Sequence, residues 1–190
     1  RAGEGERLVR SGQWHGWHPT HMLSTQVTGK TLGIVGMGRI GLALAKQAHY
    51  GLGMSMVYSS RVERSEQELQ GLHAKHCPLD ELLAACDFVS LHCPATPQTR
   101  HLINSDTLSK MKPTALLINT ARGDVVNERD LIAALRQGVI AGAGLDALLG
   151  WMNKPAERSN AGGAEPSNPL ASASLSPGIA GVSHHAQQQF

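Results

Sequence analysis

Between residues 28 and 148, short apolar runs that stop at glycine or proline alternate with segments whose apolar positions recur at helical spacing. The apolar runs predict strands at 31–36, 54–60, 87–94, 115–121 and 140–147. The helical spacing predicts helices at 39–50, 65–72, 79–87, 104–111 and 127–138. Strands that alternate with helices imply a parallel sheet covered on both faces. The pattern therefore predicts a doubly wound α/β domain of Rossmann type.

The pattern differs on either side of this domain. Residues 1–27 predict a short amphipathic helix at 3–11, followed by a connector rich in tryptophan and histidine. Residues 149–190 are rich in Ser, Ala, Gly and Pro and have no sustained period, which predicts an irregular, disordered tail. The expected organisation is a helix and connector at 1–27, a dinucleotide-binding domain at 28–148, and this tail.

Composition narrows the class of protein but does not identify it. The net charge is only +2, which gives no reason to expect nucleic acid as a partner, and no apolar run reaches the length of a membrane span. The three cysteines form no CxxC pair, so we expect a reducing, cytoplasmic setting. Three histidines recur in the connector beside helix-breaking residues, and we expect surface imidazoles rather than a metal site: His15, His18 and His21.

A glycine-rich turn follows the first predicted strand and opens the first long helix. In "GMGRIG", Gly36, Gly38 and Gly41 have the GxGxxG spacing. The first glycine permits a tight turn, the second lets the backbone approach a pyrophosphate, and the third lets helix and strand pack closely. Phosphates would then lie at the helix amino end, near Arg39 and Ile40. Since the motif lies inside a βαβ unit, it predicts dinucleotide binding, although the same spacing can also serve a merely tight turn.

The end of the second strand indicates which dinucleotide to expect. An NAD site usually has an acidic residue there, whereas this chain has Ser59, Ser60 and Arg61. Two hydroxyl groups and a guanidinium suit a phosphate, so NADP(H) is preferred and NAD(H) remains possible. The alternative is that Arg61 is a solvated loop residue.

The stretch "LLINTARGDVVN" drives a buried strand into an arginine, Arg122. The position just past the carboxyl end of a core strand is where open α/β folds bind ligands. We therefore expect an anionic ligand near Arg122.

Together, "GIVGMGRIG", "LHCPATPQTRHLI", "LLINTARGDVVNERDLIAAL" and "AGAGLD" resemble the D-isomer-specific 2-hydroxyacid dehydrogenases, especially the glyoxylate/hydroxypyruvate and 2-ketogluconate reductases. The resemblance implies NAD(P)H-dependent reduction of small 2-oxo acids, such as glyoxylate or hydroxypyruvate, to D-2-hydroxy acids. It implies that Arg122 is catalytic and binds the substrate carboxylate and α-oxygen. It also implies cofactor contacts around the nicotinamide at Cys93, Pro94, Thr99, Thr120, Ala121 and Asp146. Residues 4–17 resemble the stretch that joins two subunits, so a homodimer is expected.

Two departures from the family pattern leave alternatives open. Most of the family's substrate lobe, which comes from an amino-terminal segment, is expected to be missing from this chain. The family's Glu-Pro and Pro-His motifs match Glu165-Pro166 and His184-His185 only poorly. One hypothesis is that the tail after Asp146 is the product of a shifted reading frame. A non-catalytic dinucleotide-binding remnant or sensor module is the alternative to an enzyme. A methyltransferase is disfavoured because it leaves "NTARGD" without a role.

Overall fold

The computed structural model describes residues 1–146; the expected tail, with Glu165 and His184, lies outside the described residues. Six parallel strands form one sheet in the order β3-β2-β1-β4-β5-β6. Their bounds are β1 Thr31–Val35, β2 Ser55–Ser59, β3 Lys75–His76, β4 Phe88–Leu91, β5 Leu116–Asn119 and β6 Gly142–Leu145. The strand order reverses between β1 and β4, which is the doubly wound topology expected from the sequence.

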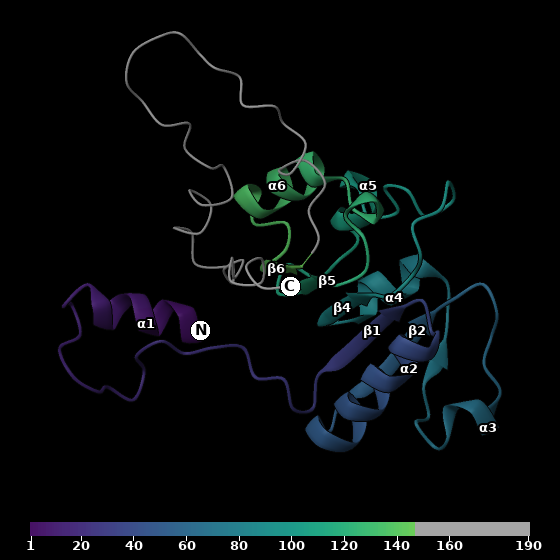
Figure 1. Cartoon of the computed structure of the whole chain (residues 1–190), viewed down its shortest axis with the longest axis horizontal. Coiled ribbons are helices and arrows are strands. Elements are labelled where there is room, and N and C mark those ends of the chain that lie inside the picture. The colour runs from purple at the N-terminus through teal and green to yellow at the C-terminus, as the bar shows by residue number, and fades with distance from the viewer. Residues whose placement is uncertain (147–190) are drawn as a thin grey trace, which may run out of the picture.

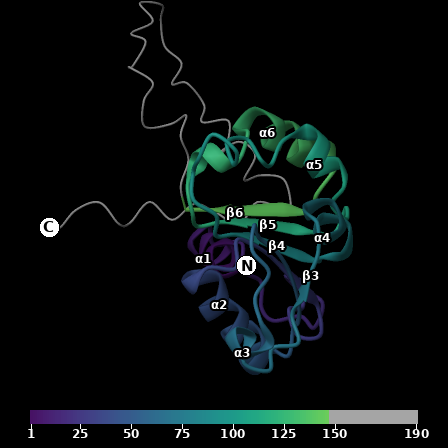
Figure 2. The same ribbon diagram turned by 90° about the vertical axis from the view of Figure 1, so that its right-hand side faces the viewer.

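Helices cover both faces of this sheet (Figure 2). One layer contains α4 Leu79–Ala85, α5 Ser105–Ser109 and α6 Glu128–Gln137, and its core is continuous with the buried face of β4 and β5. The other contains α2 Arg39–Lys46 and α3 Glu66–Leu69, which pack on β1 and β2. The sheet therefore separates two apolar clusters. Crossovers between parallel strands are right-handed, so the helices between β1 and β3 cover one face and those between β4 and β6, which lie on the other side of β1, cover the opposite face.

Three local features were not predicted. The first long helix continues from α2 into a π-helical turn, η1 Gln47–Gly51. Strand β3, at Lys75–His76, has only two residues, too few to show an alternation. It exists because its backbone pairs with Val57 and Tyr58 of β2. A 3-10 turn, η2 Gly123–Val125, also follows β5.

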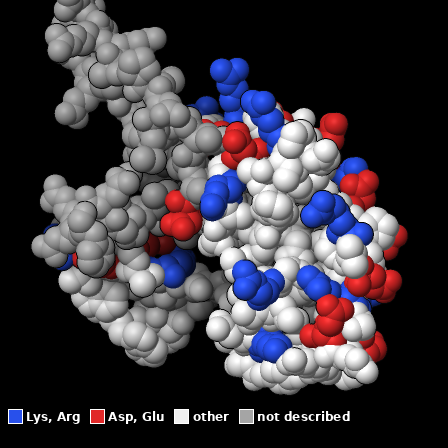
Figure 3. Space-filling view, turned by 45° about the vertical axis from the view of Figure 1, so that its right-hand side comes forward, with Lys and Arg blue, Asp and Glu red and all other residues white. Residues whose placement is uncertain are grey.

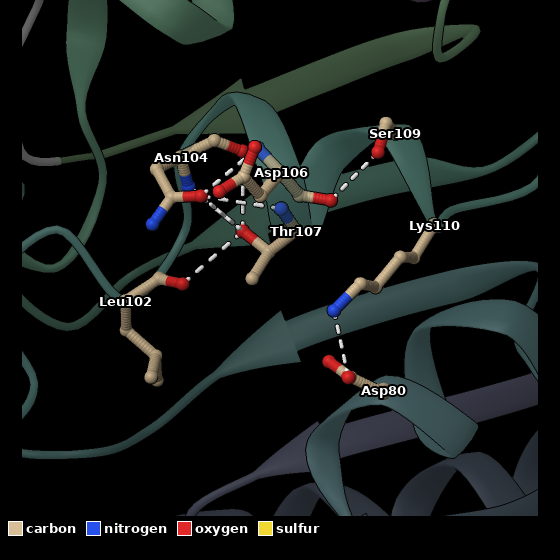
Figure 4. A network of polar contacts seen from close by, with 7 residues as sticks. All are labelled: Asp80, Leu102, Asn104, Asp106, Thr107, Ser109 and Lys110. Atoms are coloured by element: carbon tan, nitrogen blue, oxygen red, sulfur yellow. Dashed lines mark hydrogen bonds and ion pairs between the residues drawn. The ribbon is translucent and has the colours of Figure 1, made fainter.

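Polar contacts lie at the ends of α4 and α5 in the first layer (Figure 4). Asn104 caps α5 by accepting hydrogen bonds from the backbone N–H groups of Asp106 and Thr107. Lys110 reaches Asp80 of α4 at 2.7 Å, but both side chains are well exposed. An exposed ion pair contributes little, so apolar packing holds these helices together.

The amino-terminal helix α1, Ala2–Arg10, lies apart from the sheet (Figure 1). None of its residues is buried. Apolar side chains of α1 and the connector are instead exposed to solvent, among them Val9, Trp14, Trp17 and Leu23. The predicted helix is confirmed, and it forms an arm rather than part of the domain core.

Candidate dinucleotide and acid site

The predicted site residues follow five different strands of the sheet. Strand pairing places the last residues of these strands in one row across the sheet: Ser59, Val35, Leu91, Asn119 and Leu145. Neighbouring strands are about 4.8 Å apart, so the row from Ser59 to Asn119 spans roughly 14 Å. The turns that follow this row form one continuous edge, with the glycine turn near its middle. This is the edge at which doubly wound folds bind ligands.

The glycine turn can form because Gly36 and Gly41 have no Cβ atom. Gly36 has φ +98°, and a Cβ there would lie 2.8 Å from the backbone nitrogen of Cys93. A Cβ on Gly41 would lie 2.5 Å from the Gly36 carbonyl oxygen. The turn is also fixed by a hydrogen bond from the Gly36 N–H to the Ser59 carbonyl, at 2.8 Å. Strands β1, β2 and β4 and helix α2 thus meet at these two glycines.

Gly38 differs from its two neighbours because a Cβ there would meet no atom within 4 Å. It is the N-cap residue of α2 and provides no side-chain cap among the described residues. The first N–H groups of a helix have no partner within the helix. Here they belong to Arg39, Ile40 and Gly41, and the helix dipole adds positive potential. This open, donor-rich place fits a pyrophosphate group, and no packing inside the domain requires a glycine there.

The end of β2 carries the expected phosphate-binding residues. The Ser60 hydroxyl donates to the Val62 carbonyl at 2.6 Å, and the Ser60 carbonyl accepts a hydrogen bond from His76 Nε2 at 3.1 Å. The Arg61 side chain is exposed and has no hydrogen bond or ion pair with the residues that the structure describes. Arg61 is therefore available to a ligand, whereas Ser60 shapes the loop.

A contact of Arg64 was not foreseen. Its backbone N–H donates to the Tyr58 hydroxyl, and its Nε donates to the Met37 carbonyl, both at 2.9 Å. Its Nη1 lies 2.6 Å from Glu68 Oε1. Arg64 therefore connects the glycine turn to the β2–α3 loop. The sequence shows a second arginine near Arg61, but nothing in its spacing indicates that the side chain turns back to Met37.

The segment after β4 is compact. The Thr96 N–H donates to the Thr99 hydroxyl at 2.8 Å, and that hydroxyl donates to the Pro94 carbonyl at 2.6 Å. Cys93 is buried, and burial raises the pKa of its thiol. A buried thiol with a raised pKa is a poor nucleophile, and Cys93 packs in the apolar core as a small hydrophobic residue.

The turn after β5 is held by a residue that the sequence analysis did not single out. Asn119 is only 1% exposed. Its Nδ2 donates to the Arg122 carbonyl at 2.9 Å, and its Oδ1 accepts from the Ala121 N–H at 3.0 Å. A polar residue that ends an apolar strand was the available signal. Asn119 folds the turn so that Arg122 stands at the sheet edge.

Arg122 is exposed, and its Nη1 donates to the Ala121 carbonyl at 2.8 Å. The rest of its guanidinium can form a forked contact with a carboxylate. Thr120 is exposed beside it, and the Asp146 N–H donates to the Asn119 carbonyl at 3.0 Å. The structure thus brings Arg122, Thr120 and Asp146 to one place, at the β5–β6 end of the row.

The connector histidines take part in local contacts. His18 Nδ1 bonds the Thr20 hydroxyl at 2.9 Å, and the His21 ring lies 5.3 Å from the Trp14 ring at a tilt of 39°. In residues 1–146, no three His, Cys, Asp or Glu side chains gather where they could hold a metal ion.

Over the same residues, no helix is long and apolar enough to cross a membrane. Basic and acidic side chains mix over the face in Figure 3 rather than separating by sign.

Comparison with known proteins identifies the family. Residues 1–161 match the NAD-binding domain of the D-isomer specific 2-hydroxyacid dehydrogenases. The chain belongs to that family. A nicotinamide dinucleotide is therefore the cofactor class of this domain, as the resemblance predicted; the glycine turn had predicted a dinucleotide.

Curated relatives of the dehydrogenase domain agree with this assignment. The chain is 50% identical over 147 residues to a glyoxylate reductase of Korarchaeum cryptofilum, covering 77% of this chain and 44% of the relative. It is 48% identical over 141 residues to glyoxylate/hydroxypyruvate reductase B of Pectobacterium carotovorum, covering 74% of this chain and 44% of the relative. The chain thus spans a little under half the length of these relatives.

Solved structures confirm the fold. The TT0316 protein of Thermus thermophilus superposes with a TM-score of 0.78 at 40% identity, covering 94% of this chain and 50% of that protein. An acyclic imino acid reductase (Bsp5), solved with NADPH and D-Arg, superposes with a TM-score of 0.70 at 31% identity, covering 80% of this chain and 47% of that protein.

Proposed function

We propose that this domain serves an NADP(H)-dependent reductase of small 2-oxo acids, such as glyoxylate or hydroxypyruvate, and forms D-2-hydroxy acids. The observation that carries the proposal is the shared sheet edge, which places an open pyrophosphate cradle after β1 and an exposed arginine after β5, with β4 between these two strands. The names of the curated relatives supply the substrate class.

The protein's own residues have distinct tasks in this proposal. Gly38 and the first N–H groups of α2 hold the pyrophosphate. Cys93, Pro94, Thr99, Thr120 and Asp146 surround the nicotinamide, which supplies the hydride when the cofactor is bound. Arg122 orients the acid by its carboxylate and stabilises negative charge that develops on the α-oxygen. A proton donor is also required, and the expected candidates, Glu165 and His184, lie outside the described residues.

The preference for NADP(H) rests on Ser59, Ser60 and Arg61. No carboxylate stands at the end of β2 to bond the ribose hydroxyls, and Arg61 is exposed and unpaired among the described residues. The Bsp5 reductase, whose structure contains NADPH, is a structural neighbour that supports this preference. Titration of the chain with NADPH and NADH measures it directly. Arg61→Asp should reduce the NADPH-to-NADH affinity ratio at least tenfold by replacing an attraction for the 2′-phosphate with repulsion. An unchanged ratio contradicts the assignment.

A homodimer is also part of the proposal. The arm formed by α1 and the connector exposes apolar side chains that the domain leaves uncovered, including Trp17, which is 81% exposed. A second copy that covers this arm would remove them from water. Sedimentation equilibrium of the chain should give twice its monomer mass; a monomer at all concentrations excludes the dimer for this chain.

Oxidation of NADPH in the presence of glyoxylate or hydroxypyruvate tests the activity. Arg122→Ala should abolish turnover and leave NADPH affinity unchanged, because Arg122 contacts the acid and not the pyrophosphate. NADPH binding without any turnover by the native chain would instead establish the alternative of a non-catalytic binding module.

A further inference from the structure

The two arginines of the β2–α3 loop differ in what their side chains contact. Arg61 has no hydrogen bond or ion pair within residues 1–146, whereas Arg64 uses its backbone N–H, Nε and Nη1. The Nη1 contact with Glu68 also pairs the charge of Arg64 within its own loop. A ligand phosphate at this loop therefore meets one available guanidinium and one that is already engaged.

The contact with Met37 lies next to the pyrophosphate cradle. The Met37 carbonyl accepts from Arg64 Nε at 2.9 Å, and the next N–H, that of Gly38, donates to the Gly36 carbonyl at 2.9 Å. The Met37–Gly38 peptide is thus held on both sides, one residue before α2 begins. The orientation of this peptide sets where the first N–H groups of α2 point.

The loop that carries Arg64 is itself anchored. Tyr58 is 1% exposed, and its hydroxyl accepts the Arg64 N–H at 2.9 Å. Glu68 pairs with Arg64 through Oε1 and accepts the Ser65 N–H at 2.9 Å through Oε2, which caps α3. Arg64 is therefore fixed at both its backbone and its guanidinium. A residue that connects the glycine turn to the β2–α3 loop needs both of these anchors.

We propose that Arg64 is a positioning residue that clamps the glycine turn to the β2–α3 loop, so that Arg61 alone selects the 2′-phosphate. This inference rests on the proposed NADP(H) function and assigns different roles to Arg64 and Arg61. Arg64 supports the pyrophosphate cradle, which NADPH and NADH share. Arg61 contacts the one group in which these cofactors differ.

The test compares dissociation constants of the full chain for NADPH and NADH. Arg64→Met keeps the unbranched stem and removes the donors, and it should weaken both cofactors by the same factor, about fivefold, with their ratio unchanged. Arg136→Met, on the exposed face of α6, removes one positive charge elsewhere and should leave both constants unchanged. Tyr58→Phe loosens the same loop without changing any charge, and should weaken both cofactors equally and by less.

A second measurement does not depend on affinity. Hydrogen exchange at Gly38 should become faster in the cofactor-free Arg64→Met chain, because the bond from the Gly38 N–H to the Gly36 carbonyl weakens when the Met37–Gly38 peptide loses its contact with Arg64. Arg136→Met should leave this exchange unchanged. Tyr58→Phe repeats the affinity test if Arg64→Met fails to fold.

The outcomes separate this inference from the proposed function. A native chain that binds neither cofactor rejects both. If the native chain binds, a change of the NADPH-to-NADH ratio in Arg64→Met, like that expected for Arg61→Asp, shows that Arg64 contacts the phosphate and overturns the positioning role. Unchanged affinities for both cofactors in Arg64→Met also overturn it and leave the NADP(H) assignment of Arg61 standing.

Discussion

The turn after β1 and the turn after β5 stand at the same sheet edge and are built by opposite means. The glycine turn exists because side chains are missing at Gly36 and Gly41, where any Cβ would collide with backbone. The Arg122 turn forms because the buried Asn119 side chain bonds two backbone groups, the Ala121 N–H and the Arg122 carbonyl. A site for an extended phosphate needs open backbone, whereas a site for a carboxylate needs a guanidinium held in place.

The largest expected effect comes from adding a single methyl group to the glycine turn. Gly36→Ala forces a side chain into a conformation with φ +98° and against the Cys93 backbone. Strain and overpacking together should lower the free energy of unfolding by about 3 kcal/mol. Chemical denaturation of the full chain measures this change.

Gly38→Ala is the matched control for Gly36→Ala. Its Cβ would meet no atom within 4 Å, so stability should change little. Dinucleotide affinity should nevertheless fall, because the methyl group stands where the pyrophosphate approaches. If Gly36→Ala and Gly38→Ala lower the free energy of unfolding equally, the steric difference between these two glycines is contradicted. If Gly38→Ala binds NADPH as tightly as the native chain, the cradle is misplaced.

A smaller effect is expected at the other turn. Asn119→Ala leaves the Ala121 N–H and the Arg122 carbonyl without their partner, which should cost about 2 kcal/mol of stability. Affinity for NADPH should change little, because the pyrophosphate cradle lies on β1 and α2. Hydrogen exchange at Val125 and Val126 should become faster, since their bonds hold the turn that begins at Arg122.

Asn127→Ala provides the control for the asparagine. Asn127 also bonds backbone N–H groups through Oδ1, at the start of α6, but it is less buried than Asn119. Its loss should cost about 1 kcal/mol, as for an ordinary helix cap. Equal losses in the two variants would mean that Asn119 is only another cap.

The two turns also show what can be predicted from sequence. The strand–helix alternation and the glycine spacing are local, so they predicted the sheet, its doubly wound order and the residues of the cradle. Asn119 and Arg64 could not be assigned in this way, because their roles depend on contacts that only the folded chain creates. Strand β3 was missed for the same reason: two residues carry no periodicity, and pairing with β2 alone defines them.

The smallest effect is expected at the opposite edge of the sheet, where the two turns share one support. Asp87 precedes β4, accepts the Thr31 N–H at 2.9 Å and lies 2.9 Å from Lys112 Nζ. The Thr31 N–H, and next the Lys112 ammonium, hold the pKa of the Asp87 carboxyl below its usual value. Since the folded state favours the carboxylate, this stabilisation is present above about pH 4 and is lost as the pH falls through the lowered pKa.

Asp87→Asn removes the charge and keeps an oxygen that can accept the Thr31 N–H. It should therefore cost only about 0.5 to 1 kcal/mol at neutral pH, because the partly exposed contact with Lys112 is the main loss. Denaturation at a series of pH values should show the difference from the native chain shrinking toward zero in acid. Hydrogen exchange near Gly38 and near Val125 should rise equally, because Asp87 joins β1, β4 and β5 at their amino ends. A difference that persists in acid would show that the carboxylate charge is not its source. Faster exchange at only one turn would show that the two turns are supported separately.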